Sequence, residues 1–196
     1  MSSAGFFIEK TIPGMLKIVM SKYGGIFQNK FKRPRVRPPR TWVDHLLDLA
    51  ILDVVLFSIG YAIWAYSSLP ATIPTKFNAA GTVTSTGPAE MVFLMPAIGL
   101  VICVILRLVQ HWPWISNTIV EITEANAAVQ YALINRMLGW CGVLICGLFL
   151  VIEIGLVEGA RTGISNPNFG VIIATAALAP WPPLLGWYFW RSFRAA

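Results

Sequence analysis

Charged residues are scarce in this sequence. Only 12% of its 196 residues are Asp, Glu, Lys or Arg, whereas 56% are hydrophobic. A soluble domain typically carries about 25% charged residues. The shortage therefore argues against a water-soluble domain and indicates that lipid surrounds much of the chain.

Motifs that carry chemistry are missing as well. The sequence has no nucleophile elbow, phosphate-binding loop, dinucleotide-binding glycine pattern or zinc-protease motif. Its three cysteines fall inside apolar runs without the spacing of a zinc site or redox pair, so we expect them to be packing residues. The first 20 residues also lack the apolar core and cleavage site of a secretory signal peptide. We therefore expect neither an enzyme nor a bound metal.

The sequence does contain four apolar runs of about 20 residues, the length that a helix needs to cross a hydrocarbon core of about 30 Å. We predict membrane-spanning helices over 46–66, 91–110, 137–157 and 169–190. Helices are expected because backbone groups in lipid must be hydrogen-bonded within their own segment. Prolines predict kinks or an early break in two of the spans, at Pro96, Pro180, Pro182 and Pro183.

Basic residues predict the orientation of these helices. Nine lie before the first span: Lys10, Lys17, Lys22, Lys30, Lys32, Arg33, Arg35, Arg37 and Arg40. The loops after the first and third spans contain only Lys76 and Arg161. The positive-inside rule then places both termini in the cytoplasm. The expected fold class is an all-α, four-helix integral membrane protein, N-in and C-in, of the bacterial inner membrane.

The predicted domains are a basic arm over 1–40, a three-span domain over 41–158, and a fourth span with a short basic tail over 159–196. In the arm, apolar residues recur on one helical face between Phe6 and Tyr23, which predicts an amphipathic helix at the membrane interface or against a partner. The proline-rich end of the arm is expected to be extended. Nucleic acid is not an expected partner, because topology and anionic lipid explain basic residues beside a span.

The segment 69–87, between the first two spans, combines prolines and glycines with apolar residues. Its notable residues are Pro70, Ile73, Pro74, Phe77, Asn78 and Gly81. Residues 73–78 are expected to be extended and Gly81 to form a turn. Ile73 and Phe77 would share one side of an extended chain and rest on the ends of the spans. We predict an ordered lid outside the cytoplasm; a stiff connector is the alternative.

The third span is preceded by residues that also favour a helix. Thr123 suits an N-cap, Glu124 suits the positive helix end, and several alanines follow. We predict one helix over 123–157, about 52 Å long. Because this exceeds the bilayer thickness, about ten residues at its start would stand in the cytoplasm.

Two motifs carry a resemblance to a known family. The first, L-P-x-x-I-P-x-x-F-N-x-x-G, is formed by Leu69, Pro70, Ile73, Pro74, Phe77, Asn78 and Gly81. The second, I-T-x-x-N-A-x-x-Q-Y, is formed by Ile122, Thr123, Asn126, Ala127, Gln130 and Tyr131. With both motifs in this order, the chain resembles the bacterial membrane family called domain of unknown function 1648 over about 37–157.

The domain that defines this family forms the front half of SdpI-type immunity proteins, which protect a bacterium from its own toxic peptide. The resemblance therefore implies a role in membrane protection or signalling, or an unassigned role, and no enzymatic activity. Lys76 stands where members often carry His, which argues against a His-based metal or pH role at the loop.

Ionisable residues inside the predicted spans are functional candidates. They are Asp48, Asp53, Arg107 and Glu153. We predict that Arg107 pairs with Asp48 or Asp53, because all three lie within about 10 Å of the inner edge. Asp53 and Glu153 differ in depth by about 14 Å, which excludes direct pairing. A proton or cation relay would need more polar steps than the spans provide.

The two histidines, His45 and His111, lie at the predicted inner interface. They are weak candidates for cofactor ligands, and hydrogen-bonded surface histidines are the expected alternative. No cofactor is predicted, although bound lipid is expected.

The leading functional prediction is a non-enzymatic accessory or assembly subunit of a larger membrane complex, with an energy-transducing complex among the options. Its expected partners are the bilayer and other membrane subunits. The alternative is an SdpI-like immunity or signalling protein that senses a peptide at the outer face. A small ion or proton transporter is the third choice.

Overall fold

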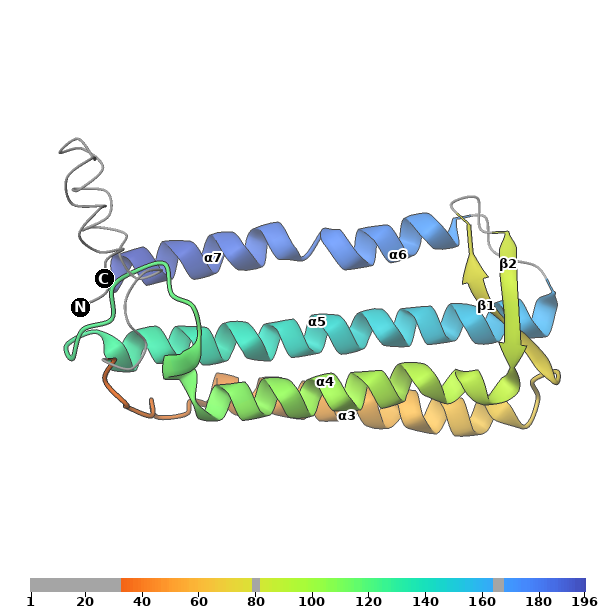
Figure 1. Cartoon of the computed structure of the whole chain (residues 1–196), viewed down its shortest axis with the longest axis horizontal. Coiled ribbons are helices and arrows are strands. Elements are labelled where there is room, and N and C mark those ends of the chain that lie inside the picture. The colour runs from red at the N-terminus through yellow and green to blue at the C-terminus, as the bar shows by residue number, and fades with distance from the viewer. Residues whose placement is uncertain (1–32, 79–81, 164–167) are drawn as a thin grey trace, which may run out of the picture.

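The computed structural model describes residues 33–78, 82–163 and 168–196, so the amphipathic helix predicted in the arm lies outside the described residues. Long helices run side by side along one axis, and a β-hairpin closes the end away from the C-terminus (Figure 1). The elements are α3 (Trp42–Tyr66), β1 (Thr72–Phe77), β2 (Val83–Pro88), η3 (Ala89–Phe93), α4 (Leu94–His111), η4 (Pro113–Ile115), α5 (Ala127–Thr162), α6 (Phe169–Leu178) and α7 (Trp181–Arg194).

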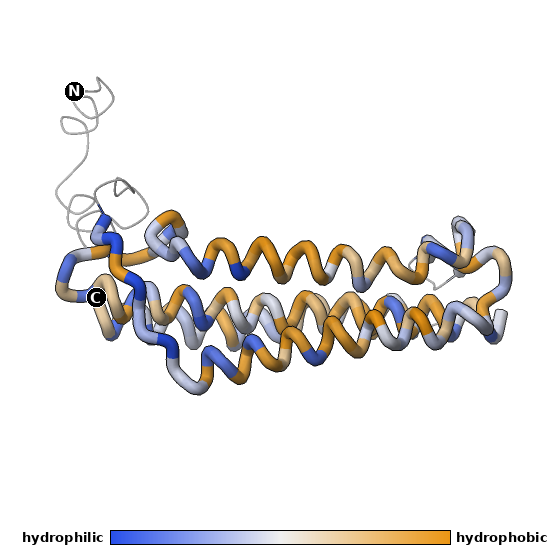
Figure 2. Tube along the Cα trace, turned by 90° about the horizontal axis from the view of Figure 1, so that it is seen from below, coloured by the Kyte–Doolittle hydropathy of each residue, from blue (hydrophilic) through white to orange (hydrophobic). Residues whose placement is uncertain are grey.

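In the described part of the chain, four helical segments are long and apolar enough to cross a membrane, as predicted. They are Trp42–Tyr66, Ala89–His111, Ala127–Thr162 and Phe169–Arg194. Apolar residues cover the shafts of the helices, and polar residues gather toward the ends, most densely at the end that holds the C-terminus (Figure 2). The chain is therefore a multi-pass membrane protein, and its orientation remains a prediction.

The helix of the third span begins later than predicted. α5 starts at Ala127 with Asn126 at its N-cap, so Thr123 is not the cap. Thr123 and Asn126 instead bond to each other: the Thr123 N–H donates to Asn126 Oδ1 at 2.9 Å, and the Asn126 N–H donates to Thr123 Oγ1 at 3.3 Å. This reciprocal pair forms a turn before the helix. α5 then runs for 36 residues, or about 54 Å, and ends at Gly163 with a left-handed φ of 67°.

Proline breaks the fourth span, as predicted. α6 ends at Leu178 and α7 begins at Trp181, with Pro180 between them as the N-cap of α7. Pro96 has a milder effect because it lies in the first turn of α4, where no intrahelical N–H bond is lost. The 3₁₀ helix η3 leads directly into that turn.

α5 is the central helix. It packs against α3 and α4 on one side and against α6 and α7 on the other (Figure 1). Glycines allow the close approaches: a Cβ added at Gly142 would lie 2.7 Å from Ile51 Cδ1 of α3, and one at Gly155 would lie 1.9 Å from the ring of Phe169 of α6. The contacts of α6 and α7 with the other helices are made mainly with α5.

The segment between the first two spans is a hairpin rather than a connector. β1 and β2 pair antiparallel from Thr72 opposite Pro88 to Phe77 opposite Val83, with register irregularities between Pro74 and Phe77. The extended first strand was predicted, whereas the second strand was not. The side chain of Phe77 lies outside the described residues, so the expectation that Ile73 and Phe77 share one side of the strand stays a prediction.

Ile73 attaches this hairpin to the helices. Its side chain is only 1% exposed and packs in one cluster with Ala62 and Ala65 of α3, Val92 of η3 and Val157 of α5. The hairpin thus rests on the ends of three helical segments, as expected for a lid.

Candidate functional site

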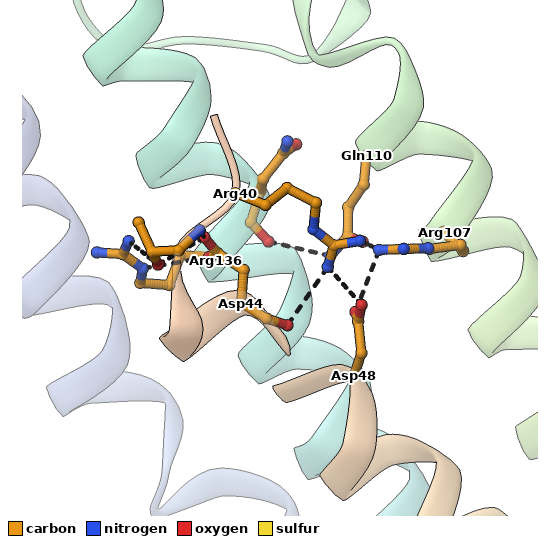
Figure 3. A network of polar contacts seen from close by, with 8 residues as sticks. Arg40, Asp44, Asp48, Arg107, Gln110 and Arg136 are labelled. Carbon is orange, nitrogen blue, oxygen red and sulfur yellow. Dashed lines mark hydrogen bonds and ion pairs between the residues drawn. The ribbon is translucent and has the colours of Figure 1, made fainter. Parts of the chain in front are cut away.

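A network of arginine and aspartate side chains joins α3, α4 and the segment that precedes α3 at the polar end of the bundle (Figure 3). Arg107 Nη1 lies 3.1 Å from Asp48 Oδ1, which confirms the predicted pairing of Arg107 with an acid of the first span. Arg107 also donates to Gln110 Oε1 at 3.1 Å, and Arg40 donates to the second oxygen of Asp48. Two arginines therefore share one carboxylate.

A second ion pair connects the start of α3 to α5. Arg136 Nε lies 3.4 Å from Asp44 Oδ1, and Arg136 Nη2 donates to Thr41 Oγ1 at 3.1 Å. Asp44 also accepts the Thr41 N–H at 2.7 Å, which caps the first turn of α3. The pair is less exposed than the Asp48 network and fixes the point at which the chain enters the bundle.

The segment before α3 has neither helix nor strand over residues 34–40, as its prolines predicted, and its start is anchored. Arg33 is 3% exposed and donates to the backbone oxygen of Ser116 at 2.6 Å and to Thr118 Oγ1 at 3.0 Å. Burial lowers the pKa of the Arg33 guanidinium, and nearby Tyr131 acts in the opposite direction. Tyr131 also donates to the backbone oxygen of Pro34 at 2.9 Å.

The second sequence motif builds this end of the protein. Thr123 and Asn126 form the turn before α5, and Tyr131 holds the basic segment. Gln130 is fully buried and binds α7: its Nε2 donates to the Ser192 backbone oxygen at 2.9 Å, and Ser192 Oγ donates to its Oε1 at 2.7 Å. The motif residues are therefore explained by contacts within the chain.

The first motif builds the hairpin at the opposite end. Ile73 and Pro74 are buried, whereas Pro70 is exposed. Asn78 closes the strand pair, because its N–H donates to the Thr82 oxygen and its Oδ1 accepts the Thr82 N–H, each at 2.9 Å. The side chain of Phe77 and the whole of Gly81 lie outside the described residues.

The two remaining acids of the spans have opposite surroundings. Glu153 of α5 is fully buried and accepts a hydrogen bond from Ser58 of α3, and its Oε1 has no hydrogen-bond partner among the described residues. Asp53 of α3 is exposed and, within the described part of the chain, forms no ion pair or side-chain hydrogen bond. The structure therefore does not bring Asp53 to Arg107, and Asp48 is the partner instead.

The histidines are not brought together as ligands. His45 is exposed on α3, and His111 is exposed at the end of α4 with its ring edge against Trp112, the ring centroids 5.2 Å apart. Among the described residues, no group of three or more His, Cys, Asp or Glu side chains could hold a metal ion.

A pocket of about 470 Å³ opens beside the Asp48 network. Arg37, Arg40 and Arg107 line it together with His111 and Asn135. The Oδ1 atom of Asn135 is buried and has no hydrogen-bond partner in the described structure. This volume is in the range of small-molecule sites, so the pocket can hold a ligand of moderate size.

Sequence reasoning missed several of these contacts. Arg40 was counted only as part of the basic arm, and Arg33 and Arg136 were not connected to any partner. Ser58 gave a usable signal, because it is a polar residue inside a span and could have been matched to Glu153. The contacts of Arg33 and Arg136 join residues more than 80 positions apart, and no local pattern predicts them. Arg40 and Asp48 are only 8 positions apart, but they lie on either side of the start of α3.

Comparison with known proteins finds a family match for part of the chain. The family described as Domain of unknown function (DUF1648) matches residues 54–100, from the middle of α3 through the hairpin into α4. The match contains the first motif, whereas the second motif at 122–131 lies outside it. No curated protein and no solved structure matches the chain. Over residues 54–100 this chain is therefore similar to the family Domain of unknown function (DUF1648).

Proposed function

We propose that this protein is a non-enzymatic accessory or assembly subunit of a larger complex in the bacterial inner membrane. Asp53 carries the proposal. It is an exposed carboxylate on a membrane-spanning helix, about seven residues inside the predicted inner edge, or about 10 Å deep. Ionisable side chains within membrane spans almost always face protein or water rather than lipid, because their insertion into lipid is costly. A partner helix that covers Asp53 would remove this cost.

The surroundings of Asp53 suit a helical partner. At about 100° per residue, one face of α3 around Asp53 also carries Leu49, Leu56, Phe57 and Gly60. We call these four residues together with Asp53 the Asp53 stripe. All are exposed, and apart from the backbone of α3 itself, no atom of the described residues lies within 4 Å of a Cβ added at Gly60. A small residue at a membrane helix surface lets a second helix approach closely, and a donor on that helix would satisfy Asp53.

The fourth span offers further surface to neighbouring subunits. α6 and α7 contact the bundle mainly through α5, so their other faces are exposed to whatever surrounds the protein. Within the membrane these faces are compatible with lipid as well as with protein. They therefore support the proposal less strongly than Asp53 does.

Site-specific photo-crosslinking in native membranes tests the proposal. A photoreactive residue at position 57, within the Asp53 stripe, is expected to capture a different membrane polypeptide, and Asp53→Leu should weaken that product strongly. Position 101 on α4 is the matched control, because Val101 and Phe57 are both 57% exposed. Equal products from both positions that do not respond to Asp53→Leu would contradict the proposal. A product with the mass of two copies of this chain would replace the hetero-complex with a homo-oligomer.

A second candidate, an SdpI-like immunity or signalling protein, is favoured by the hairpin. β1 and β2 form a two-stranded sheet, so the outer edge of β2 is unpaired within the described structure. An extended peptide can add to such an edge by main-chain hydrogen bonds. Extraction in mild detergent separates the candidates: a stable complex favours the assembly role, and a lone monomer favours peptide sensing.

A further inference from the structure

We propose that the basic end of the bundle is a binding site for an anionic phospholipid, with the phosphate in the arginine-lined pocket and an acyl chain in an adjoining groove between α3 and α4. Three observations carry this assignment: the charge of the pocket, the apolar character of the groove, and the continuity of the two.

The pocket has an excess of positive charge. Among the described residues, Asp48 is the only carboxylate that pairs with Arg40 and Arg107, and Asp44 is already paired with Arg136. Arg37 also lines the pocket, is exposed, and forms no ion pair in the described part of the chain. Two positive charges are therefore not neutralised at its wall. Guanidinium groups bind phosphate oxygens through paired N–H donors, so a phosphate group complements this pocket.

The groove beside the pocket has a different lining. It has a volume of about 440 Å³. Its walls away from the polar end consist of Cys103 and aliphatic side chains, among them Ile51 and Val55 of α3 and Leu100 and Val104 of α4. From Asp48 to Val55 the groove follows α3 for about 10 Å toward the middle of the membrane. An acyl chain fits these walls, whereas a water-soluble anion makes no use of them.

The pocket and the groove meet at α4. Arg107, Leu108 and Gln110 line both. Arg107 stands at the junction, with its guanidinium on Asp48 and Gln110 (Figure 3) and its side chain 52% exposed. An amphipathic ligand with an anionic head and an apolar tail matches this sequence of surfaces. Basic pockets between membrane helices at the headgroup level are known to bind such lipids.

Native mass spectrometry of the full-length protein in detergent tests the assignment. The protein is offered equal amounts of phosphatidylglycerol and phosphatidylcholine with identical acyl chains. We expect the wild type to retain phosphatidylglycerol preferentially. Arg37→Gln should reduce that preference about fivefold, the effect of one basic residue near an anionic lipid. Arg35→Gln is the matched control, because Arg35 has the same charge and is also exposed but does not line the pocket.

The groove is tested separately. Val104→Phe should fill it and reduce retention of both lipids, whereas Val101→Phe should have no effect, because Val101 is on the same helix and similarly exposed but does not line the groove. Equal retention of the two lipids by the wild type, or equal effects of the Arg37 and Arg35 substitutions, would overturn the assignment. Displacement of the lipid by millimolar inorganic phosphate would instead identify a site for the free ion and also overturn it.

Discussion

The contact between α5 and α6 can be tested by replacing Gly155 with alanine. A Cβ at this position would lie 1.9 Å and 2.0 Å from two atoms of the Phe169 ring, and Phe169 is only 8% exposed. Overpacking of this kind destabilises by about 1–3 kcal/mol. The higher helix propensity of alanine returns about 0.5–1 kcal/mol. We therefore expect Gly155→Ala to lower the free energy of unfolding by about 1 kcal/mol, the difference of these two effects.

Gly147→Ala is the control, because Gly147 lies in the same helix and, apart from the backbone of α5 itself, no atom of the described residues is within 4 Å of an added Cβ. That substitution should stabilise by about 0.5–1 kcal/mol. Unfolding in mixed micelles with increasing sodium dodecyl sulfate, followed by circular dichroism, compares the variants. In a Phe169→Ala background the obstacle is gone, so Gly155→Ala should become stabilising, and the double-mutant cycle should show a coupling of about 1–3 kcal/mol. Equal stabilisation by both glycine substitutions in the Phe169 background would refute the close packing of α6 on α5.

Three further predictions concern contacts within the bundle. Ser58→Ala should lower the free energy of unfolding by about 1–3 kcal/mol, because it leaves both oxygens of buried Glu153 without a hydrogen-bond partner in the described structure. In the same unfolding assay, the double variant Ser58→Ala with Glu153→Leu should be more stable than Ser58→Ala alone. Arg33→Gln should remove the hydrogen bonds that hold the segment 113–120 in place. The backbone amides of this segment should then exchange hydrogen faster, whereas exchange in the hairpin should not change. Ile73→Ala should cost about 2–5 kcal/mol of local stability and speed exchange in β1 and β2, and unchanged exchange there would contradict its role as the hairpin's anchor.

The sequence by itself determined that lipid surrounds much of this protein and where its helices lie. Apolar runs of membrane-spanning length defined the four spans, and Pro180 marked the break between α6 and α7. The pairing of Arg107 with an acid of the first span, Asp48 or Asp53, could also be predicted, because a known rise per residue places all three near the same edge of the membrane. These properties follow from local composition and helix geometry, and they need no knowledge of which helices are neighbours.

Tertiary structure decided the remaining contacts. β2 (Val83–Pro88) consists mostly of small polar residues, which do not by themselves indicate a strand. It is a strand because it pairs with β1. Asp53 was an equal candidate for Arg107 until the packing of α3 turned it outward and Asp48 toward α4. Arg33 finds its acceptors more than 80 positions away. Depth along a helix is fixed by counting residues, but the direction that a side chain faces depends on which neighbour the helix packs against, and only the assembled bundle contains that information.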